Sequence, residues 1–291
     1  MMRAFVCTLL LIIFFSLPCL AELKVVAPAE VFQGRSFIVF LSAVDELDSP
    51  LAIKSASADF NGSRITFFPY EEGLRAIIGT MPEITIGEYP LTIEATVTGK
   101  EKDTKEIKEL SVTVSPRIYP SVSFWIKPAK KQVFTPALVD DEWGQIQKEL
   151  LKESPDKLWS GEFVTPVPGI TTMYFGTKEL VNGHPRSRHR GQDFRAKIGT
   201  PVRAGHNGRV TVAQFFKAFG GTVVIDHGQG IDTLYFHLSK IIAQVGQGIK
   251  QGEVLGLSGN TGMSSGPHVH WGMSVHDVRV DPIQWVKTII P

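Results

Sequence analysis

Histidine is concentrated in the C-terminal part of this chain, and two short motifs there contain residues that could do chemistry. All eight histidines lie at or after position 184 of 291. His189 stands four residues before Asp193, around a glycine, and His268 stands two residues before His270. Side chains at positions i and i+2 of a strand face the same side, so both imidazoles of the second motif point into one cavity. The pattern indicates a single binding site.

A set of two histidines and one carboxylate suits a catalytic zinc ion. Such a site uses three protein ligands and keeps a fourth position open for water. Thiolate ligands and disulfides are excluded beyond the first 19 residues, because the only two cysteines are Cys7 and Cys19. A His-x-His pair alone is common by chance. Together with the segment Tyr235–Ser239, which contains His237, the two motifs become specific.

Further motifs surround these residues in a fixed order. Gly199-Thr200-Pro201-Val202 follows the first motif, Gly259-Asn260-Thr261-Gly262 follows His237, and Gly266-Pro267-His268-Val269-His270-Trp271-Gly272 contains the second. With these segments, residues from about 172 to 285 resemble the lysostaphin/LytM-type zinc metallopeptidase domain, which is found in peptidoglycan endopeptidases. The resemblance implies a metallopeptidase domain built on an antiparallel β-sheet.

The resemblance also implies a role for each residue of the site. His189, Asp193 and His270 are expected to bind one zinc ion per chain, and His237 and His268 are expected to be the unligated catalytic pair. No His-Glu-x-x-His motif is present, so no helix-borne glutamate is available as a general base. Histidine can take that role, because its unperturbed pKa is about 6.5. Which of the two histidines is the base stays open.

The other four histidines are expected to have no metal role: His227 shapes a turn, His206 and His276 are loop residues, and His184 either lines the groove or is solvated. Tyr235 either donates to the reaction intermediate or packs within its strand. Three arginines near the first motif either contact substrate carboxylates or remain solvated. They are Arg186, Arg188 and Arg190.

Residues 1–21 are typical of a secretory signal peptide. A short positive segment, Met1–Arg3, precedes an apolar run, Ala4–Leu17, and small residues lead to a cleavage point after Ala21. The run is too short for a comfortable membrane span, so no stable membrane insertion is expected after cleavage. An uncleaved anchor and a lipid on Cys19 are the alternatives. The expected location is the periplasm or cell envelope.

Three regions are expected after this leader. Residues 22–116 contain short β-branched or alternating runs between turn residues, which predicts an immunoglobulin-like β-sandwich. Residues 117–160 form a proline-punctuated connector with a short helix from about Asp140 to Glu153, whose first residues are acidic. Residues 161–291 are glycine-rich and β-rich, which predicts the antiparallel sheet of the metallopeptidase domain. The fold class is therefore expected to be mainly β.

The net charge and its distribution indicate which classes of macromolecule the chain could bind. The formal net charge is only +1, so nucleic acid is not an expected partner. Residues 160–291 carry 13 basic and 8 acidic side chains, which suits an acidic polymer such as a cell wall or is simply a solvated surface of mixed charge.

The leading hypothesis is a secreted zinc endopeptidase that hydrolyses peptide cross-links of bacterial peptidoglycan. Whether it cuts a D-alanine to diaminopimelate bond or a glycine bridge stays open. One alternative is a non-catalytic, wall-binding activator of other hydrolases, which the complete set of five site residues disfavours. Another is a secreted peptidase that acts on proteins. Autoinhibition by the N-terminal domain and connector, or regulation by another envelope protein, is a further hypothesis.

Overall fold

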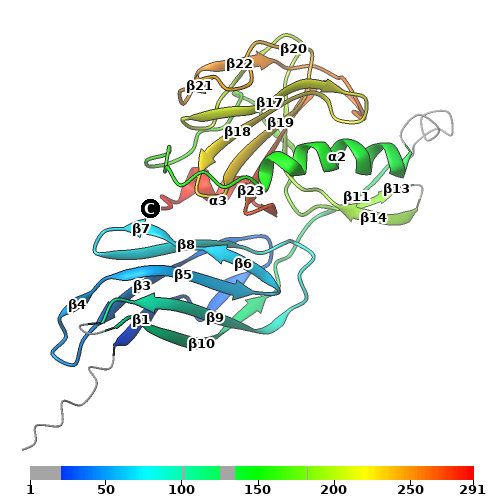
Figure 1. Ribbon diagram of the computed structural model, residues 1–291. Helices are drawn as coiled ribbons and strands as arrows, with labels where there is room; N and C mark the ends of the chain where they lie inside the picture. Colours follow the sequence, from blue (N-terminus) through cyan, green and yellow to red (C-terminus); the bar gives the residue numbers. More distant parts are fainter. Residues whose placement is uncertain (1–20, 100–101, 125–134, 182) are drawn as a thin grey trace, which may run out of the picture.

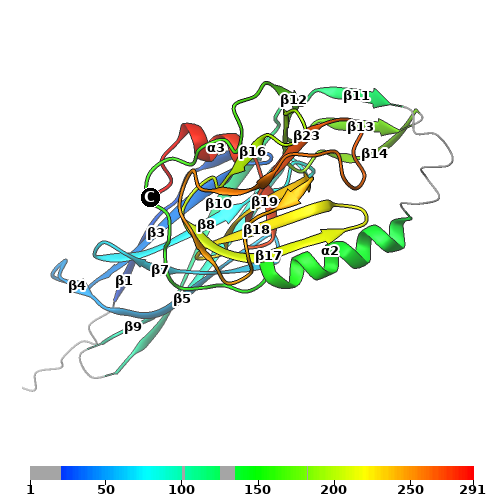
Figure 2. The same ribbon diagram turned by 90° about the horizontal axis from the view of Figure 1, so that it is seen from above.

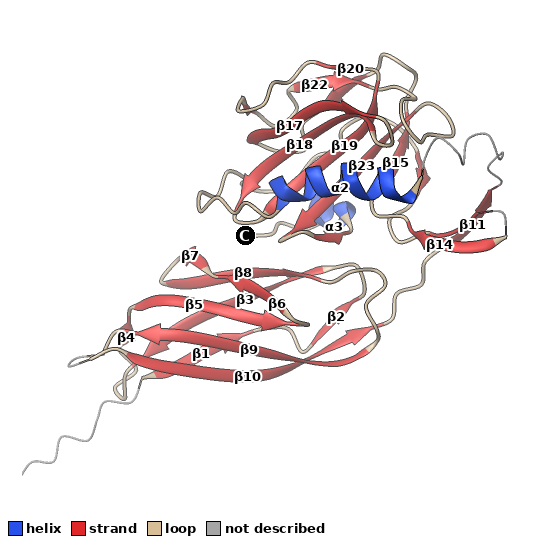
Figure 3. Cartoon of the chain, turned by 45° about the vertical axis from the view of Figure 1, so that its right-hand side comes forward, coloured by secondary structure: helices blue, strands red, loops and turns tan. Residues whose placement is uncertain are grey.

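The computed structural model describes residues 21–99, 102–124, 135–181 and 183–291, and these are mainly β. Two β domains are stacked on one another, and two helices accompany them in the described ranges (Figure 1, Figure 3). The expected mainly β fold class is confirmed. Residues 1–20 of the expected signal peptide, with both cysteines, lie outside the described residues. In the part of the chain that is described, no helix combines the length and apolar character needed to cross a bilayer.

The N-terminal domain is a sandwich of two sheets. The first sheet has the order β1 (Glu22–Val26), β3 (Ser36–Val44), β8 (Gly73–Gly79) and β7 (Phe68–Tyr70), and β4 (Pro50–Leu51) pairs with β3. The second sheet has the order β2 (Glu30–Phe32), β10 (Thr104–Ser115), β9 (Gly87–Val97), β5 (Ile53–Phe60) and β6 (Ser63–Thr66). The β2–β10 pair is parallel, and the other pairs are antiparallel.

Alternating side chains build the core of this sandwich. Leu91, Ile93 and Ala95 are buried at every second position of β9. They pack in one cluster with Val39 and Leu41 of β3, which belongs to the opposite sheet. The two-residue period of a strand therefore gives each sheet one apolar face, and the two faces meet.

The connector contains a strand as well as a helix. Strand β11 (Ser121–Phe124) pairs in parallel with β13 (Lys178–Val181), which pairs with β14 (His184–Arg188). Helix α2 spans Pro136–Leu150, so the expected start near Asp140 is wrong by about one turn. Thr135 caps the helix through a bond from the Leu138 amide, and Pro136 occupies the first turn. Both residue types favour a helix start, and the acidic residues lie beyond the first turn.

The C-terminal domain is organised around an eight-stranded sheet. Its order is β12 (Thr171–Met173), β15 (Gln192–Arg195), β23 (His268–Val275), β19 (Ile231–Leu238), β18 (Gly220–Gly228), β17 (Gly208–Phe216) and β21 (Gly248–Ile249), with β24 (Val278–Val280) also paired to β23. A second sheet contains β16 (Pro201–Arg203), β22 (Val254–Leu257) and β20 (Lys240–Ile241). Helix α3 (Pro282–Lys287) follows and was not expected from the sequence.

The two faces of the large sheet are covered differently. Helix α2 covers one face, where Ile146 and Leu150 pack against Val212, Leu234 and Phe236. The helix lies along β17, and the sheet of β11, β13 and β14 lies beyond its first turn (Figure 2). The opposite face carries Val223, Tyr235 and Trp271 in a separate cluster that includes Val202 and Leu255 of the second sheet.

The two domains share an apolar cluster. Ile38 and Ile77 of the sandwich pack with Met273, Val275 and Trp285 of the C-terminal domain. In Figure 1, strands β7 and β8 lie directly below α3 and β23. A shared core of this kind opposes independent motion of the two domains.

Polar contacts reinforce the same junction. The buried Asp281 carboxylate lies 2.7 Å from the Arg117 guanidinium and 3.9 Å from that of Arg35. It also accepts the Ile283 amide and so caps α3. Arg75 of the sandwich is fully buried and donates to the side-chain oxygen of Gln229.

Candidate metal centre and active site

The first cluster of the site comes from two neighbouring strands. Asp193 of β15 stands opposite His270 of β23 in the antiparallel register. Its Oδ1 lies 2.8 Å from Nδ1 of His270 and 2.9 Å from Nε2 of His189, which precedes β15. One donor atom from each of the three residues lies within 4.8 Å of the others, and all three residues are buried. The structure therefore brings together the three residues that were expected to bind metal.

Gly191 allows the loop before β15 to pass close to this cluster. A Cβ atom at this position would stand 2.5 Å from Nε2 of His270 and 2.7 Å from the Trp271 carbonyl oxygen. Any side chain there would displace the imidazole. The spacing of His189 and Asp193 around a glycine thus has a steric cause.

The electrostatics of the cluster favour a cation among the three side chains. Burial alone would lower the pKa of His189, but the charge of Asp193 and the hydrogen bonds of Asp193 and Glu179 outweigh it and raise that pKa to about 9. Burial would raise the pKa of Asp193, yet attraction to His189 and His270 leaves it below its ordinary value. Burial lowers the pKa of His270 to about 4 against the opposing influence of Asp193.

The chemistry of this donor set fits zinc. Two imidazoles and one carboxylate are ligands that zinc accepts, and three protein ligands match its catalytic sites. Donor atoms 2.8–2.9 Å apart are compatible within a few tenths of an ångström with one ion bonded at about 2.0–2.1 Å. The carboxylates of Asp193 and Glu179, which raise the pKa of His189, make the cluster attractive to positive charge. His189, Asp193 and His270 are thus suited to holding one zinc ion.

A second pair of histidines stands beside the first cluster. The His237 and His268 rings lie 4.8 Å apart between centroids, and Nε2 of His268 is 3.6 Å from Oδ2 of Asp193. Nδ1 of His237 lies 2.8 Å from the Thr261 carbonyl oxygen, and Nδ1 of His268 lies 2.7 Å from that of Gly266. A carbonyl only accepts, so both Nδ1 atoms carry hydrogen when neutral. Both Nε2 atoms are then left as proton acceptors.

His237 is held in an uncommon backbone conformation. Its φ is 65°, in the left-handed region that non-glycine residues rarely adopt. The Phe219 carbonyl accepts its amide at 3.1 Å, and the Thr261 carbonyl accepts its ring. Burial, followed by the charges of His268 and His270, lowers the pKa of His237 to about 3. Several contacts therefore fix a neutral imidazole at the edge of the cluster.

Two residues outside the expected set support the metal cluster. Oε1 of Glu179, on β13, lies 3.2 Å from Nδ1 of His189, the nitrogen that faces away from Asp193. The ring of Phe236 stacks on the His270 ring at 5.3 Å with an interplanar angle of 8°. Phe236 belongs to the apolar cluster beneath α2. Nothing in the local sequence indicates either contact, because both arise from strand pairing.

The other candidates have structural environments. His227 is fully buried, and its Nδ1–H donates to the Asn207 carbonyl at 2.6 Å. His227 lies within β18 rather than in the expected turn. His206 lies in a loop, as expected, but is buried beside Phe163. Tyr235 is buried and accepts the Gly205 amide at 2.7 Å, which favours the packing role over donation to an intermediate.

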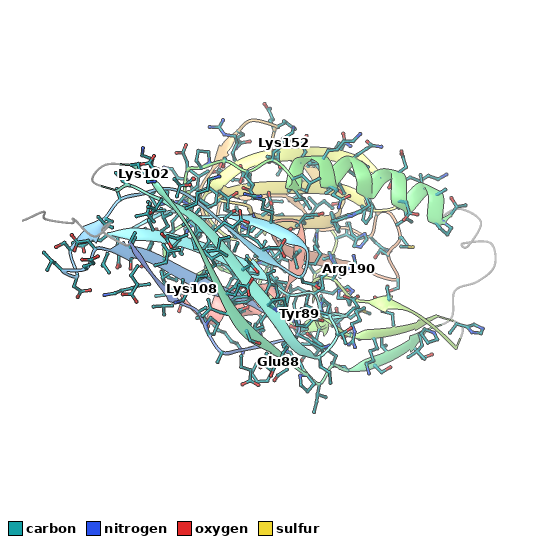
Figure 4. All side chains as sticks on the ribbon, turned by 60° about the horizontal axis from the view of Figure 1, so that its bottom comes forward. Glu88, Tyr89, Lys102, Lys108, Lys152 and Arg190 are labelled. Carbon is teal, nitrogen blue, oxygen red and sulfur yellow. The ribbon has the colours of Figure 1, made fainter. Side chains whose placement is uncertain are left out.

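The remaining histidines and two of the arginines have other partners or are exposed. His276 contacts Glu153 at 2.5 Å, and His184 is exposed. Arg188 lies over the Tyr119 ring, and the side chain of Arg186 is outside the described set. Arg190 lies 3.9 Å from Glu83 of the sandwich, a position visible from the sandwich side in Figure 4.

A cavity of about 710 Å³ adjoins the site. Asp193 and His268 form part of its wall, together with Thr172 and Met173. Arg195, two residues after Asp193 in β15, also lines it and was not among the expected site residues. The two-residue strand period could have identified Arg195, because it places that side chain on the same face as Asp193.

The geometry agrees with comparisons to known proteins. The model of Peptidase family M23 matches residues 187–282, a range that contains all five expected site residues. The C-terminal domain belongs to peptidase family M23. The expected resemblance is thereby confirmed, and the β15–β23 cluster is the expected metal site of this M23 domain.

The relatives that match the M23 domain are much longer than the segment that matches. The peptidoglycan DD-endopeptidase ShyA of Vibrio cholerae is 43% identical over 103 residues, which are 35% of this chain and 23% of that protein. The DD-carboxypeptidase/endopeptidase Mpg of Neisseria meningitidis is 39% identical over 100 residues, which are 34% and 23% of the two chains. The match thus spans about a quarter of the length of these relatives.

A solved structure resembles nearly the whole chain. A Pseudomonas aeruginosa protein assigned to peptidase M23 matches with a TM-score of 0.61 and 26% identity, over 88% of this chain and 94% of that one. The similarity therefore includes most of the region outside the M23 domain.

Proposed function

We propose that this protein is a zinc-dependent endopeptidase that hydrolyses peptide cross-links of bacterial peptidoglycan. The observation that carries the proposal is the cluster of His189, Asp193 and His270 beside the His237–His268 pair. Membership of the M23 domain in a peptidase family supports hydrolysis, and the names of the ShyA and Mpg relatives support peptidoglycan as the substrate.

In the proposed hydrolysis, three residues bind the metal and two histidines transfer protons. His189, Asp193 and His270 would hold zinc, whose Lewis acidity makes water nucleophilic near neutral pH and polarises the scissile carbonyl. Nε2 of His237 or His268 accepts the proton of the attacking water, because the Nδ1 atom of each ring is engaged with a backbone carbonyl. The other ring, once protonated, donates to the oxyanion that develops on the carbonyl.

The proposed location is the periplasm or cell envelope. The typical signal peptide at residues 1–21 supports export, and the substrate implied by the relatives lies outside the cytoplasm.

Digestion of purified diaminopimelate-type sacculi tests the proposal. Zinc-loaded protein should convert cross-linked dimers to monomers, as read by mass spectrometry of the released muropeptides. A chelated sample and the His268→Ala variant should leave the dimers intact. If zinc-loaded protein leaves every cross-link intact but increases the activity of another wall hydrolase, it is an activator. If it cuts only protein substrates, the peptidoglycan assignment is wrong.

A further inference from the structure

The sheet register places a cation directly beyond the metal cluster. In the β15–β23 ladder, Asp193 pairs with His270, and Arg195 pairs with His268. Residues i and i+2 of a strand share a face, so Arg195 and His268 form the next row on the face that carries the cluster. The two rows lie about 7 Å apart. A residue adjoining a bond held at the cluster is therefore within reach of the long Arg195 side chain.

The cavity beside the metal cluster is lined by two positively charged side chains that have no role in the proposed hydrolysis. Arg195 and Lys197 both line it and are exposed. Neither side chain has an ion-pair or hydrogen-bond partner among the described residues, and in Lys197 only the backbone carbonyl accepts hydrogen bonds, from Thr200 and Ser258. The only carboxylate on the described wall is that of Asp193, which faces the two histidines of the metal cluster. Two unpaired cations thus meet any ligand that fills this cavity.

The walls restrict the kind of ligand. Met173, Ile198 and Pro267 contribute apolar surface beside the two cations. Such a wall accepts an aliphatic portion, and a guanidinium binds a carboxylate through two parallel hydrogen bonds. The combination suits an amino acid that has an aliphatic chain and a free carboxylate.

We propose that Arg195 and Lys197 form a carboxylate-binding subsite, which selects cross-links whose scissile bond adjoins a residue with a free carboxylate. This inference rests on the proposed function and narrows its substrate. In a D-alanine to diaminopimelate cross-link, the carbon next to the scissile amide nitrogen bears a free carboxylate. The internal residues of a glycine bridge bear none. The subsite therefore favours the diaminopimelate type of cross-link.

A matched pair of substrates tests the subsite. One is a cross-linked diaminopimelate dimer, and the other is the same dimer with the carboxylate beside the scissile bond amidated. Zinc-loaded wild-type protein should cleave the first with a kcat/KM at least about tenfold higher, because a charge-assisted hydrogen bond is lost on amidation. Arg195→Ala should lower kcat/KM on the free carboxylate by about 10- to 100-fold and change that on the amide by less than about threefold.

Further variants separate recognition from folding. Arg195→Lys should restore part of the selectivity, because it keeps the charge but loses the two-bond geometry. Lys197→Ala should reduce selectivity less than Arg195→Ala, because an ammonium lacks the planar fork of a guanidinium. Arg64→Ala, which removes one exposed arginine from β6 of the sandwich, is the matched control. It should leave kcat/KM unchanged on both dimers. Unchanged zinc content and urea midpoint would establish that Arg195→Ala is folded.

Several results would overturn the subsite. Carboxylate recognition would be contradicted if Arg195→Ala lowered kcat/KM equally on both dimers, or if the wild type cleaved both dimers equally well. It would also be contradicted if the wild type preferred a pentaglycine bridge. Each of these results would leave the proposed endopeptidase activity standing. If the wild type cleaves none of these substrates, the proposed function fails and the subsite fails with it.

Discussion

At the scale of single residues, the site is a set of imidazoles whose two nitrogens face different partners. His189 directs Nε2 to Asp193 and Nδ1 to Glu179, while His237 and His268 direct Nδ1 to backbone carbonyls. The partner of one ring nitrogen fixes what the other can do, because it sets the tautomer and the orientation of the ring. In the proposed function, metal binding and proton transfer therefore belong to different histidines.

Glu179 should strengthen zinc binding without contacting the ion. A carboxylate that accepts the Nδ1 hydrogen of a ligand histidine increases the basicity of that ring, and loss of such a partner usually weakens metal affinity 10- to 100-fold. We expect Glu179→Ala to bind zinc about that much more weakly in competition with a chromogenic chelator. Glu109→Ala, which alters an exposed glutamate of β10, is the control. Equal zinc affinity in both variants would show that Glu179 plays no part.

The motifs that contain the five expected site residues could be recognised in the sequence because each motif is short and local, and the resemblance then implied the role of each residue. His268 and His270 are two positions apart in a strand, and Gly191 leaves room for the ring of His270. Glu179 could not be found, since its contact with His189 depends on β13 pairing with β14. Arg195 could be predicted from its position two residues after Asp193, but only once Asp193 is assigned to a strand.

At the scale of elements, a buried network links the central strands to a neighbouring loop. Gly205, Tyr235, Thr233, His227 and Asn207 follow one another through contacts of 2.6–3.0 Å. The network joins β19 and the end of β18 to the loop before β17. His227 is therefore a structural histidine, and its burial makes protonation costly.

Protonation of His227 should make stability depend on pH. Burial lowers the pKa of His227 from 6.5 to about 3, so below pH 6.5 the unfolded chain binds a proton that the folded chain does not. Its contribution to stability is complete above about pH 6.5 and is lost as the pH falls towards 3, by up to about 1.4 kcal/mol per pH unit.

Urea unfolding of chelated protein at pH 7.5 and pH 5.0 measures this dependence. The decrease in unfolding free energy between the two pH values should be about 2 kcal/mol smaller in His227→Gln than in the wild type. The comparison within each protein removes any cost of the substitution itself that is independent of pH. An identical decrease in both proteins would contradict a neutral, buried His227.

The helix and strand boundaries show which elements can be predicted from local pattern. From Leu91 to Val97, β9 alternates between buried and more exposed residues, so its period identifies it. β5 was not expected, because small and polar residues such as Ser55, Ser57 and Asp59 dominate it. The acidic residues predict a start of α2 near Asp140, which is about one turn too late, because Thr135 and Pro136 mark the start.

At the scale of the whole molecule, the connector between the two domains supports the M23 domain. Strand β11 pairs with the strand that carries Glu179, and α2 packs on the cluster that contains Phe236. No residue from 21–99 or 102–124 lines the described cavity. Autoinhibition by the N-terminal domain, or regulation by another envelope protein, stays a prediction. A fragment of residues 161–291 would be a poor test, because it removes β11 and α2 as well.

The shared core predicts that both domains unfold together. Residues 21–116 contain no tryptophan, so tryptophan fluorescence reports on the region outside the sandwich. Ile77 lies in the shared cluster and Ile93 in the sandwich core. We expect Ile77→Ala and Ile93→Ala to destabilise the fluorescence-detected transition by about 2–4 kcal/mol each. A fluorescence transition unchanged in Ile93→Ala would mean that the sandwich unfolds alone.

The most direct test of the central claim is a zinc titration of metal-free protein, followed by cleavage of a purified, cross-linked diaminopimelate muropeptide dimer. Cleavage should be absent without zinc, increase in proportion to added zinc and stop increasing at one zinc ion per chain. His270→Ala should neither retain zinc nor gain activity, because it removes one of three ligands. Cleavage by the chelated protein, or no cleavage at one zinc ion per chain, would contradict a zinc endopeptidase built on His189, Asp193 and His270.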